Sequence, residues 1–317
     1  MRQQSFAAED FEIYRKKTRK EKFLEEMESI IPWVELTEVI KPYYPVPKKA
    51  GRRPVGIERM LRIHFLQHWF ELSDPAAEEA LYDSRAMRRF VGIDLGKEAV
   101  PDETTILKFR HLMEAHNLGD QLFHLVNEYL IENGLKVNRG TIVDATIINA
   151  PTSTKNKDKA RDPDMHQTRK GNQWYFGMKA HIGVDSKTKL IHSIGVTAAN
   201  VHDSQMLGDL LHGEETRVWG DSAYTGQKAV LKECAPAAKD FTQKKSYRNR
   251  KLTEQEKSAN RQKSKTRSRV EHIFGIMKRQ FGYNKVRYRG LAKNAHSLYV
   301  KCALINLVVA KRKLLAA

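Results

Sequence analysis

The sequence predicts an α/β protein in which a helical N-terminal region precedes a domain built on a mixed sheet. Up to about residue 138, apolar residues recur at helical spacing. From Gly140 onward they gather instead in short β-branched runs, and segments with helical spacing follow those runs. We therefore predict a helical domain over residues 1–138 and an α/β domain over residues 139–317.

The N-terminal region contains several candidate helices. Apolar residues are helically spaced from Phe11 to Ile31, and a Pro-rich basic segment (KPYYPVPKKAGRRP) then interrupts the helix. Residues 57–72 (IERMLRIHFLQHWFEL) predict an amphipathic helix, shorter ones are expected over 75–82 and 86–91, and Asp102 is the expected N-cap of a helix over TTILKFRHLMEA. Short helices in a basic context fit a helix-turn-helix-like DNA-binding unit, and they fit a plain helical support domain almost as well.

Five strands are expected in the second domain. The first is GTIVDATIINA from Gly140, and FGMKAHIGVD and KLIHSIGVT form a pair joined by a turn at 186–188. TRVWGD is the fourth, and residues 237–242 are a candidate fifth. Helical spacing over 203–211 predicts a helix between the third and fourth strands.

The last part of the chain begins with a basic insertion. Residues 243–269 hold eleven Lys or Arg against two Glu and almost no apolar periodicity, so we expect a segment that is flexible or ordered by DNA. A helix resumes around Arg267, and a final helix is expected over about 294–314. Its apolar run, CALINLVVA, is too short to cross a bilayer and predicts a buried helix.

Charge and cysteine content narrow the class of protein. A net charge of +18 favours a polyanionic partner, because each neutralised phosphate releases counterions, although a merely basic protein would share this charge. Two cysteines without a CxxC pattern exclude a disulfide scaffold and a structural zinc site and suit a reducing compartment. The N-terminus has no apolar signal region. We therefore expect a cytoplasmic protein with no membrane partner.

Phosphodiester chemistry on a nucleic acid would require a small group of acids inside this positive surface. Two divalent cations about 4 Å apart clamp the attacking and leaving oxygens, and Mg²⁺ takes oxygen ligands. Asp144 is the first candidate, because it lies mid-strand between β-branched apolar residues, where a carboxylate is expensive to bury. The alternative is an Asp on the solvated face of an edge strand.

Two further acids complete the candidate set. Asp221 lies where a strand ends and a Gly-bounded turn begins, although an Asp capping the next helix would look the same. Glu271 lies on an amphipathic helix in one stripe with Arg267 and Lys278, and it is the last acidic residue of the chain. The alternative for Glu271 is a surface ion-pair ladder.

Other polar residues have structural explanations. Asp185 falls in the turn GVDSKTK and is expected to be structural. Asp203 precedes a helical segment, so N-capping is the default interpretation. His181 lies mid-strand and is expected to support the site or fill the core rather than act in catalysis.

The sequence resembles the DDE transposases of bacterial insertion sequences, in particular the insertion-sequence-five family. The resemblance runs from about Ile57 to Arg289 and is carried by PDETTILKFRHLME, GTIVDATIINAPTSTKNKDKARDPDMHQTRKGNQWYFGMKAHIGVD, TAANVHDS, GDSAYTG and VEHIFGIMKRQFGYNKVRYRGLAKN. In that family the first Asp follows Val in a strand, the second lies in a Gly-Asp-x-x-Tyr turn, and the Glu has Arg four residues before it and Lys seven after it. These positions match Asp144, Asp221 and Glu271, with Arg267 and Lys278 beside them.

The resemblance implies an RNase H-like catalytic domain. It further implies a transposase that binds terminal inverted repeats of double-stranded DNA, cleaves the element ends and joins the 3′-hydroxyls to target DNA. The three acids would hold two Mg²⁺, for which Mn²⁺ could substitute, Arg267 and Lys278 would hold phosphates, and such enzymes generally act as homodimers. Asp203 could then support the metal site. The family often has Tyr three residues before the Arg, where this chain has Ser264.

The candidate DNA-contacting residues lie mainly in two basic tracts, 155–170 and 244–269. Trp174 directly follows the first tract and could stack on a flipped base, although strand aromatics more often fill a core. The remaining candidates are cations: Lys170, Lys244, Lys245, Arg269, Arg279, and, in the N-terminal region, Arg52, Arg53, Arg85, Arg88 and Arg89. The alternatives to a transposase are a metal-dependent nuclease or resolvase, which would lack strand transfer, and a DNA-binding regulator without catalysis.

Overall fold

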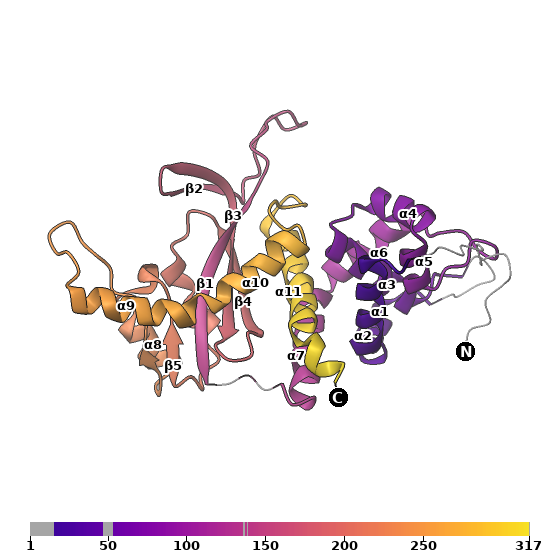
Figure 1. Ribbon diagram of the computed structural model, residues 1–317. Helices are drawn as coiled ribbons and strands as arrows, with labels where there is room; N and C mark the ends of the chain where they lie inside the picture. Colours follow the sequence, from indigo (N-terminus) through magenta and orange to yellow (C-terminus); the bar gives the residue numbers. More distant parts are fainter. Residues whose placement is uncertain (1–15, 47–52, 136, 138, 317) are drawn as a thin grey trace.

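The computed structural model describes residues 16–46, 53–135, 137 and 139–316. The first helices of the chain, up to residue 115, gather on one side of the molecule and a sheet stands on the other (Figure 1). The next helix and the C-terminal helix lie side by side between them. The helices of the N-terminal region are α1 (Arg19–Ile30), α2 (Trp33–Ile40), α3 (Ile57–Phe70), α4 (Asp74–Asp83), α5 (Arg85–Val91), α6 (Glu103–Ala115) and α7 (Leu118–Glu132).

Side-chain caps set where two of these helices begin. The Asp102 carboxylate accepts from the Thr105 amide at 2.7 Å, which confirms its predicted capping of α6. The helix expected from Phe11 begins only at Arg19 in the structure, because the Thr18 hydroxyl caps it by accepting from the Glu21 amide. The earlier part of that predicted helix, residues 11–15, lies outside the described residues.

The sheet is mixed, as the sequence predicts, and its order is β2-β3-β1-β5-β6 with β4 also paired to β3. β1 runs antiparallel to β3 and parallel to β5, so it occupies the centre. The strands are β1 (Gly140–Asn149), β2 (His166–Lys170), β3 (Gln173–Asp185), β4 (Ile191–Ala198), β5 (Arg217–Trp219) and β6 (Lys239–Asp240). β2 was not predicted, because its residues, HQTRK, are polar and lie in the basic tract.

β2 and the start of β3 form a hairpin that projects beyond the rest of the sheet (Figure 1). The helix predicted over 203–211 is two short 3₁₀ segments, Asp203–Met206 and Gly208–Leu210. A short helix, α8 (Lys228–Cys234), follows β5.

The polar segment 243–269 was expected to be flexible or ordered by DNA, and this was wrong for residues 254–267, which are helical without DNA. Residues 254–267 form helix α9 (Glu254–Arg267), which then runs into α10 (Arg269–Gly275) and a π-helical turn, Ile276–Gln280. The Thr253 hydroxyl accepts from the Glu256 amide while the Glu256 carboxylate accepts from the Thr253 amide. This capping box supplies a local start signal that apolar periodicity does not reveal.

Helix α11 (Leu291–Leu314) joins the two sides of the molecule and confirms the predicted C-terminal helix. It packs against α7, α1 and α3 and against strand β4, and its apolar run is buried. One core cluster therefore includes residues from the N-terminal helices, the sheet and α11. Within the described residues, no helix is long and apolar enough to cross a membrane.

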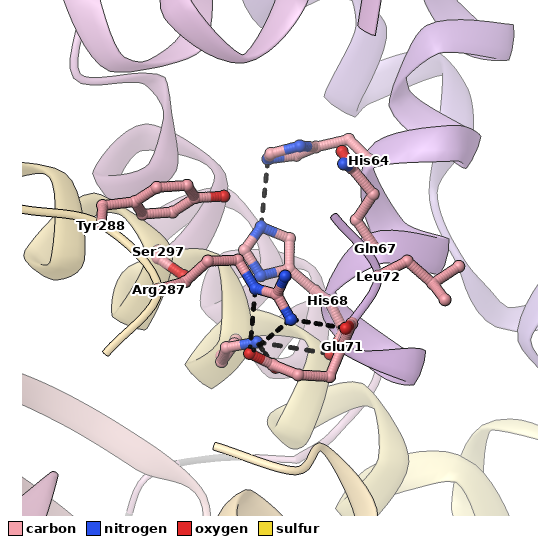
Figure 2. A pocket seen from close by; sticks show the side chains of 9 residues that line it. His64, Gln67, His68, Glu71, Leu72, Arg287, Tyr288 and Ser297 are labelled. Carbon is pink, nitrogen blue, oxygen red and sulfur yellow. Dashed lines mark hydrogen bonds and ion pairs between the residues drawn. The ribbon is translucent and has the colours of Figure 1, made fainter. Parts of the chain in front are cut away.

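A cluster of polar side chains lies where α3 meets the C-terminal part of the chain (Figure 2). Glu71, the left-handed C-cap of α3, pairs with Arg287 at 3.1 Å and with the buried amine of Lys301 at 3.0 Å. Beside them the His64 and His68 rings meet at 3.2 Å between their Nε2 atoms. These contacts attach the end of α3 to the segment that follows α10.

Candidate active site

The three predicted acids lie around one cleft. Asp144, Asp221 and Glu271 all line it, and Arg267 reaches into it from the same helical segment as Glu271. The cleft has a volume of about 510 Å³. Its other lining residues come from β1, from β2 and β3, from the segment after β4 and from α10 (Arg269–Gly275): Ala145, Thr146, Ile147, Thr168, Arg169, Lys170, Lys179, Asp203 and Phe274.

Asp144 is largely buried in the sheet. It lies in the central strand opposite Ile182, so it is not on an edge strand. Its side chain is only 14% exposed, and burial raises its pKa to about 6 despite the opposing effects of Arg267 and the Ala145 amide. The charges of Asp221 and Asp203 raise this pKa further, which indicates that several carboxylates share one region.

Asp221 follows β5, the parallel neighbour of β1. Its carboxylate accepts from the Ala223 amide at 2.8 Å and caps a short 3₁₀ turn, Ser222–Tyr224. The capping interpretation is therefore correct, and the same residue also lines the cleft. The Tyr224 hydroxyl beside it is buried and has no hydrogen-bond partner among the described residues. Burial, followed by the charges of Asp203, Asp144 and Asp221, raises the pKa of Tyr224.

Arg267 connects the other two acids. Its Nη1 donates to Asp144 Oδ2 at 2.7 Å, and its Nη2 lies 3.4 Å from Glu271 Oε1. The Glu271 side chain is 63% exposed, which places it at the rim of the cleft. Arg267 thus forms the predicted i,i+4 ion pair with Glu271 and also links the helix to strand β1 through Asp144.

Lys278 does not line this cleft. The π-helical turn changes the helical register after Gly275, and Lys278 Nζ donates to the Ile147 carbonyl of β1 at 2.9 Å. Burial and the neighbouring charge of Lys170 lower its pKa. The stripe predicted from regular helical spacing therefore ends before Lys278, because one residue more per turn rotates the later side chains.

Asp203 is an acid whose default interpretation was wrong. His202 caps the short 3₁₀ segment, whereas Asp203 faces the cleft and pairs with Lys179 at 2.8 Å. Lys179 also donates to the Val201 carbonyl at 2.6 Å. Sequence reasoning missed Lys179. Like Asp144, it is a charged residue inside an apolar strand run (FGMKAHIGVD), and this pattern could have indicated it.

Two polar residues have the structural positions that were expected. Asp185 is buried in its turn and accepts from the Lys187 and Thr188 amides. His181 is buried within the sheet, where its Nε2 is 2.8 Å from the Thr197 hydroxyl. Burial lowers the pKa of His181 to about 4.

The donor set of the cleft fits a hard divalent cation, because its acids are carboxylates and such ions prefer oxygen ligands. Burial raises the pKa of Asp144, and the Tyr224 hydroxyl beside Asp221 has no hydrogen-bond partner among the described residues, so a bound cation would favour the ionised form of Asp144. As the side chains stand, however, no three His, Cys, Asp or Glu of the described ranges are close enough together to hold a metal ion.

Comparison with known proteins adds an independent finding. A family model described as "Transposase DDE domain" matches residues 136–307, and one described as "Transposase domain (DUF772)" matches residues 11–112. The first match alone covers more than half of the chain. The chain belongs to the DDE transposase family.

A solved structure supports the fold of this transposase. The chain resembles a protein whose structure is described as a "piggyBac transposase synaptic complex with hairpin DNA", with a TM-score of 0.50 at 9% identity. The match covers 95% of this chain and 76% of the other. The predicted RNase H-like fold is thereby confirmed. As a DDE transposase, the protein is an enzyme that cleaves DNA and transfers strands, and it uses divalent metal ions.

The structure places the remaining DNA-contact candidates of the transposase in different settings. Trp174 is 64% exposed on the β2–β3 hairpin, so it does not fill the core. Arg269 instead bonds the Ser186 carbonyl, and Lys244 pairs with Glu256 at 3.1 Å. Arg52 lies outside the described residues. Arg53, Lys170, Lys245 and Arg279 are also exposed.

The arginines of α5 largely serve the fold of the N-terminal helices. Arg88 donates to the Leu81 carbonyl at the end of α4, and Arg89 pairs with Glu21 of α1 at 3.2 Å. Such contacts favour a supporting over a base-reading function for these side chains.

Proposed function

We propose that Asp144, Asp221 and Glu271 are the catalytic acids of this transposase. The observation that carries the proposal is that one cleft contains all three, although they are separated by long stretches of chain, and that Arg267 contacts two of them. Asp144 lies on the central strand β1, Asp221 follows the parallel neighbour β5, and Glu271 lies on α10. This placement brings carboxylates together inside a basic protein.

The three acids would hold two Mg²⁺, with Mn²⁺ able to substitute. When bound, such ions polarise the phosphodiester and activate the attacking oxygen. Glu271 lies at the rim and is exposed, so it is the acid best able to move toward Asp144. Arg267 would then be free to exchange its bond to Asp144 for one to a DNA phosphate.

Several other residues would position DNA. Lys170 lies in the cleft, and Trp174 is exposed on the hairpin beside it, where an indole face is available to an unpaired base. Lys278 is held against β1 by its bond to the Ile147 carbonyl and would act on a DNA phosphate through its charge. Lys244, Lys245, Arg279 and the N-terminal Arg52 and Arg53 would contact the duplex further away, whereas the backbone bond of Arg269 leaves it the weakest of these candidates.

The substrates proposed are the terminal inverted repeats of a bacterial insertion sequence of the insertion-sequence-five family, together with target DNA. The resemblance of the quoted motifs supports this family assignment. A homodimer would allow two element ends to be processed together, and a bacterial DNA substrate would place the enzyme in the cytoplasm. We also propose that residues 1–138 and 139–317 are the two domains of the chain.

The decisive experiment separates binding from chemistry. Asp144→Asn, Asp221→Asn and Glu271→Gln are each expected to abolish Mg²⁺-dependent cleavage and strand transfer while DNA binding persists. The matched control is Asp185→Asn, which changes a buried acid outside the cleft and should retain activity if the variant folds. Strand transfer retained by one of the three variants would remove that residue from the catalytic set.

A further inference from the structure

A cationic arm stands beside the active-site helix. Residues 244–251 (KKSYRNRK) leave the sheet after β6 and return at the start of α9, and they contain five Lys or Arg and no acid. All of these residues are exposed. In Figure 1 the arm loops away from the body of the molecule at the N-terminal end of α9, the end remote from α10.

The tip of the arm is a closed turn. The Tyr247 amide donates to the Arg250 carbonyl at 3.0 Å, and the Arg250 amide donates back to the Tyr247 carbonyl at 3.2 Å. This reciprocal pair leaves Arg248 and Asn249 at the apex. Tyr247 is 55% exposed, so its ring is accessible to a ligand. We call residues 245–250 the finger.

Glu256 of α9 holds the base of the finger. One of its carboxylate oxygens pairs with Lys244 at 3.1 Å and with Arg250 at 2.8 Å, and the other accepts from the Thr253 amide. Asn260, one turn further along α9, bonds both the amide and the carbonyl of Lys244 at 3.0 Å. The orientation of the finger is thus set by the same helix that leads to Glu271.

This helix also fixes a distance. Glu256 and Glu271 are 15 residues apart in α9 and α10, and the intervening Ser268 keeps helical backbone angles. At about 1.5 Å per residue the separation is about 22 Å, the length of roughly six or seven base pairs. A duplex whose scissile phosphate lies in the cleft and which extends along α9 would therefore meet the finger.

We propose that the finger is a second DNA contact of this transposase, which grips the duplex about six or seven base pairs from the cleavage point. This inference rests on the proposed catalytic function of the cleft. Its cations, Lys245 and Arg248 among them, would bind phosphates, and the aromatic side chain of Tyr247 would enter a groove. Glu256 is a positioning residue, because it touches the finger and not the DNA.

Charge complementarity identifies duplex DNA as the occupant. A segment with five cations and no acid repels another copy of this basic chain, whose net charge is +18. α9 itself has no buried residue, so polar contacts and charge rather than apolar packing account for its position.

The first test measures binding without chemistry. The probe is a mixed-sequence 40-base-pair fluorescent duplex in buffer without divalent metal, titrated with full-length protein at several salt concentrations. The plot of log K against log salt has a negative slope. In the finger variant Lys245→Gln/Arg248→Gln, this slope is expected to be shallower by about 1.8, because each phosphate contact contributes about 0.9. The charge-matched control, Arg312→Gln/Lys313→Gln at the exposed end of α11, should leave the slope within about 0.5 of the wild-type value.

The second test separates an ordered finger from charge alone. Glu256→Gln removes a negative charge, yet Gln still suits the capping box of α9. Simple charge attraction predicts tighter binding by this variant, whereas loss of a preformed finger predicts Kd increased about threefold or more. Hydroxyl-radical footprinting on a cleavable duplex should then lose protection at the distal position, with protection at the cleavage point unchanged.

The outcomes are distinguishable. An unchanged salt slope in the finger variant, or tighter binding by Glu256→Gln, would overturn the finger while leaving the active site intact. Failure of the wild-type protein to bind any duplex would instead contradict the proposed function itself. Reduced slope together with retained oligomeric state supports DNA as the occupant, and a changed oligomeric state in the finger variant would assign the surface to a partner subunit.

Discussion

Arg267 on α9 donates to the Asp144 carboxylate on β1 at 2.7 Å, across 123 positions of the sequence. The guanidinium is 22% exposed, and its other nitrogen lies near Glu271. One cation therefore compensates two proposed catalytic acids in the DNA-free protein. The pairing holds the helix against the sheet at the proposed catalytic site.

Replacement of Arg267 is expected to impair the chemical step more than DNA binding. Arg267→Gln should reduce cleavage about 100-fold or more, because a charge aimed at the reacting phosphate would be lost. Single-turnover cleavage and duplex Kd should be measured together, with Arg267→Lys as the matched variant. Equal losses of binding and cleavage in Arg267→Gln would argue for a binding function alone.

The junction shown in Figure 2 is expected to dominate the stability of the helical side. Glu71→Gln leaves the buried Lys301 amine without its counter-charge, and removal of one partner from a buried pair costs about 3 kcal/mol or more. Urea unfolding checks this value. Glu38→Gln, which breaks only the exposed pair with Lys41, should change stability by less than about 0.5 kcal/mol.

The free energy of unfolding is expected to fall in mild acid, because several histidines are buried in the folded protein. Burial lowers the pKa of His64 to about 3, of His192 to about 3 and of His296 to about 4. Because the folded pKa lies below the unfolded value near 6.5, the unfolded chain binds more protons and stability falls as pH drops below about 6.5.

Each such histidine should therefore cost about 1.4 kcal/mol at pH 5.5 relative to pH 7.5. Urea midpoints at the two pH values measure the change. The exposed His124 provides the control, since His124→Gln should leave the difference unaltered. A midpoint that rises on acidification would contradict the prediction.

Gly177 is expected to be required for folding of the projecting hairpin. It pairs with both Asn149 of β1 and His166 of β2, and a Cβ atom there would overlap the Ile148 carbonyl oxygen. Gly177→Ala should destabilise the protein by about 2 kcal/mol or more, since backbone atoms cannot move aside easily. Gly275→Ala in α10 has open space around it and should instead stabilise by about 0.5 to 1 kcal/mol. Thermal unfolding of both variants decides the comparison.

Local patterns predicted much of the architecture. The apolar runs around Asp144 and the helical spacing around Glu271 are strong because each reflects one buried face. Asp102 was correctly predicted as a cap, since its function depends on only three following residues. The polar helix α9 was missed because its stability comes from a capping box and hydrogen bonds to residues 243–244, including Gln243 Nε2 to Ser264 Oγ at 2.6 Å.

The sequence by itself determined the α/β fold class, the family and the identity of the three candidate acids, because these depend on local residue patterns and on recognisable motifs. Only the tertiary structure decided that Arg267 bonds Asp144, that Asp203 lines the cleft and pairs with Lys179, and that Lys278, in a π-helical turn, donates to the Ile147 carbonyl of β1. Those relationships depend on strand order, helical register and the packing of distant segments. None of these is encoded in the spacing of neighbouring residues.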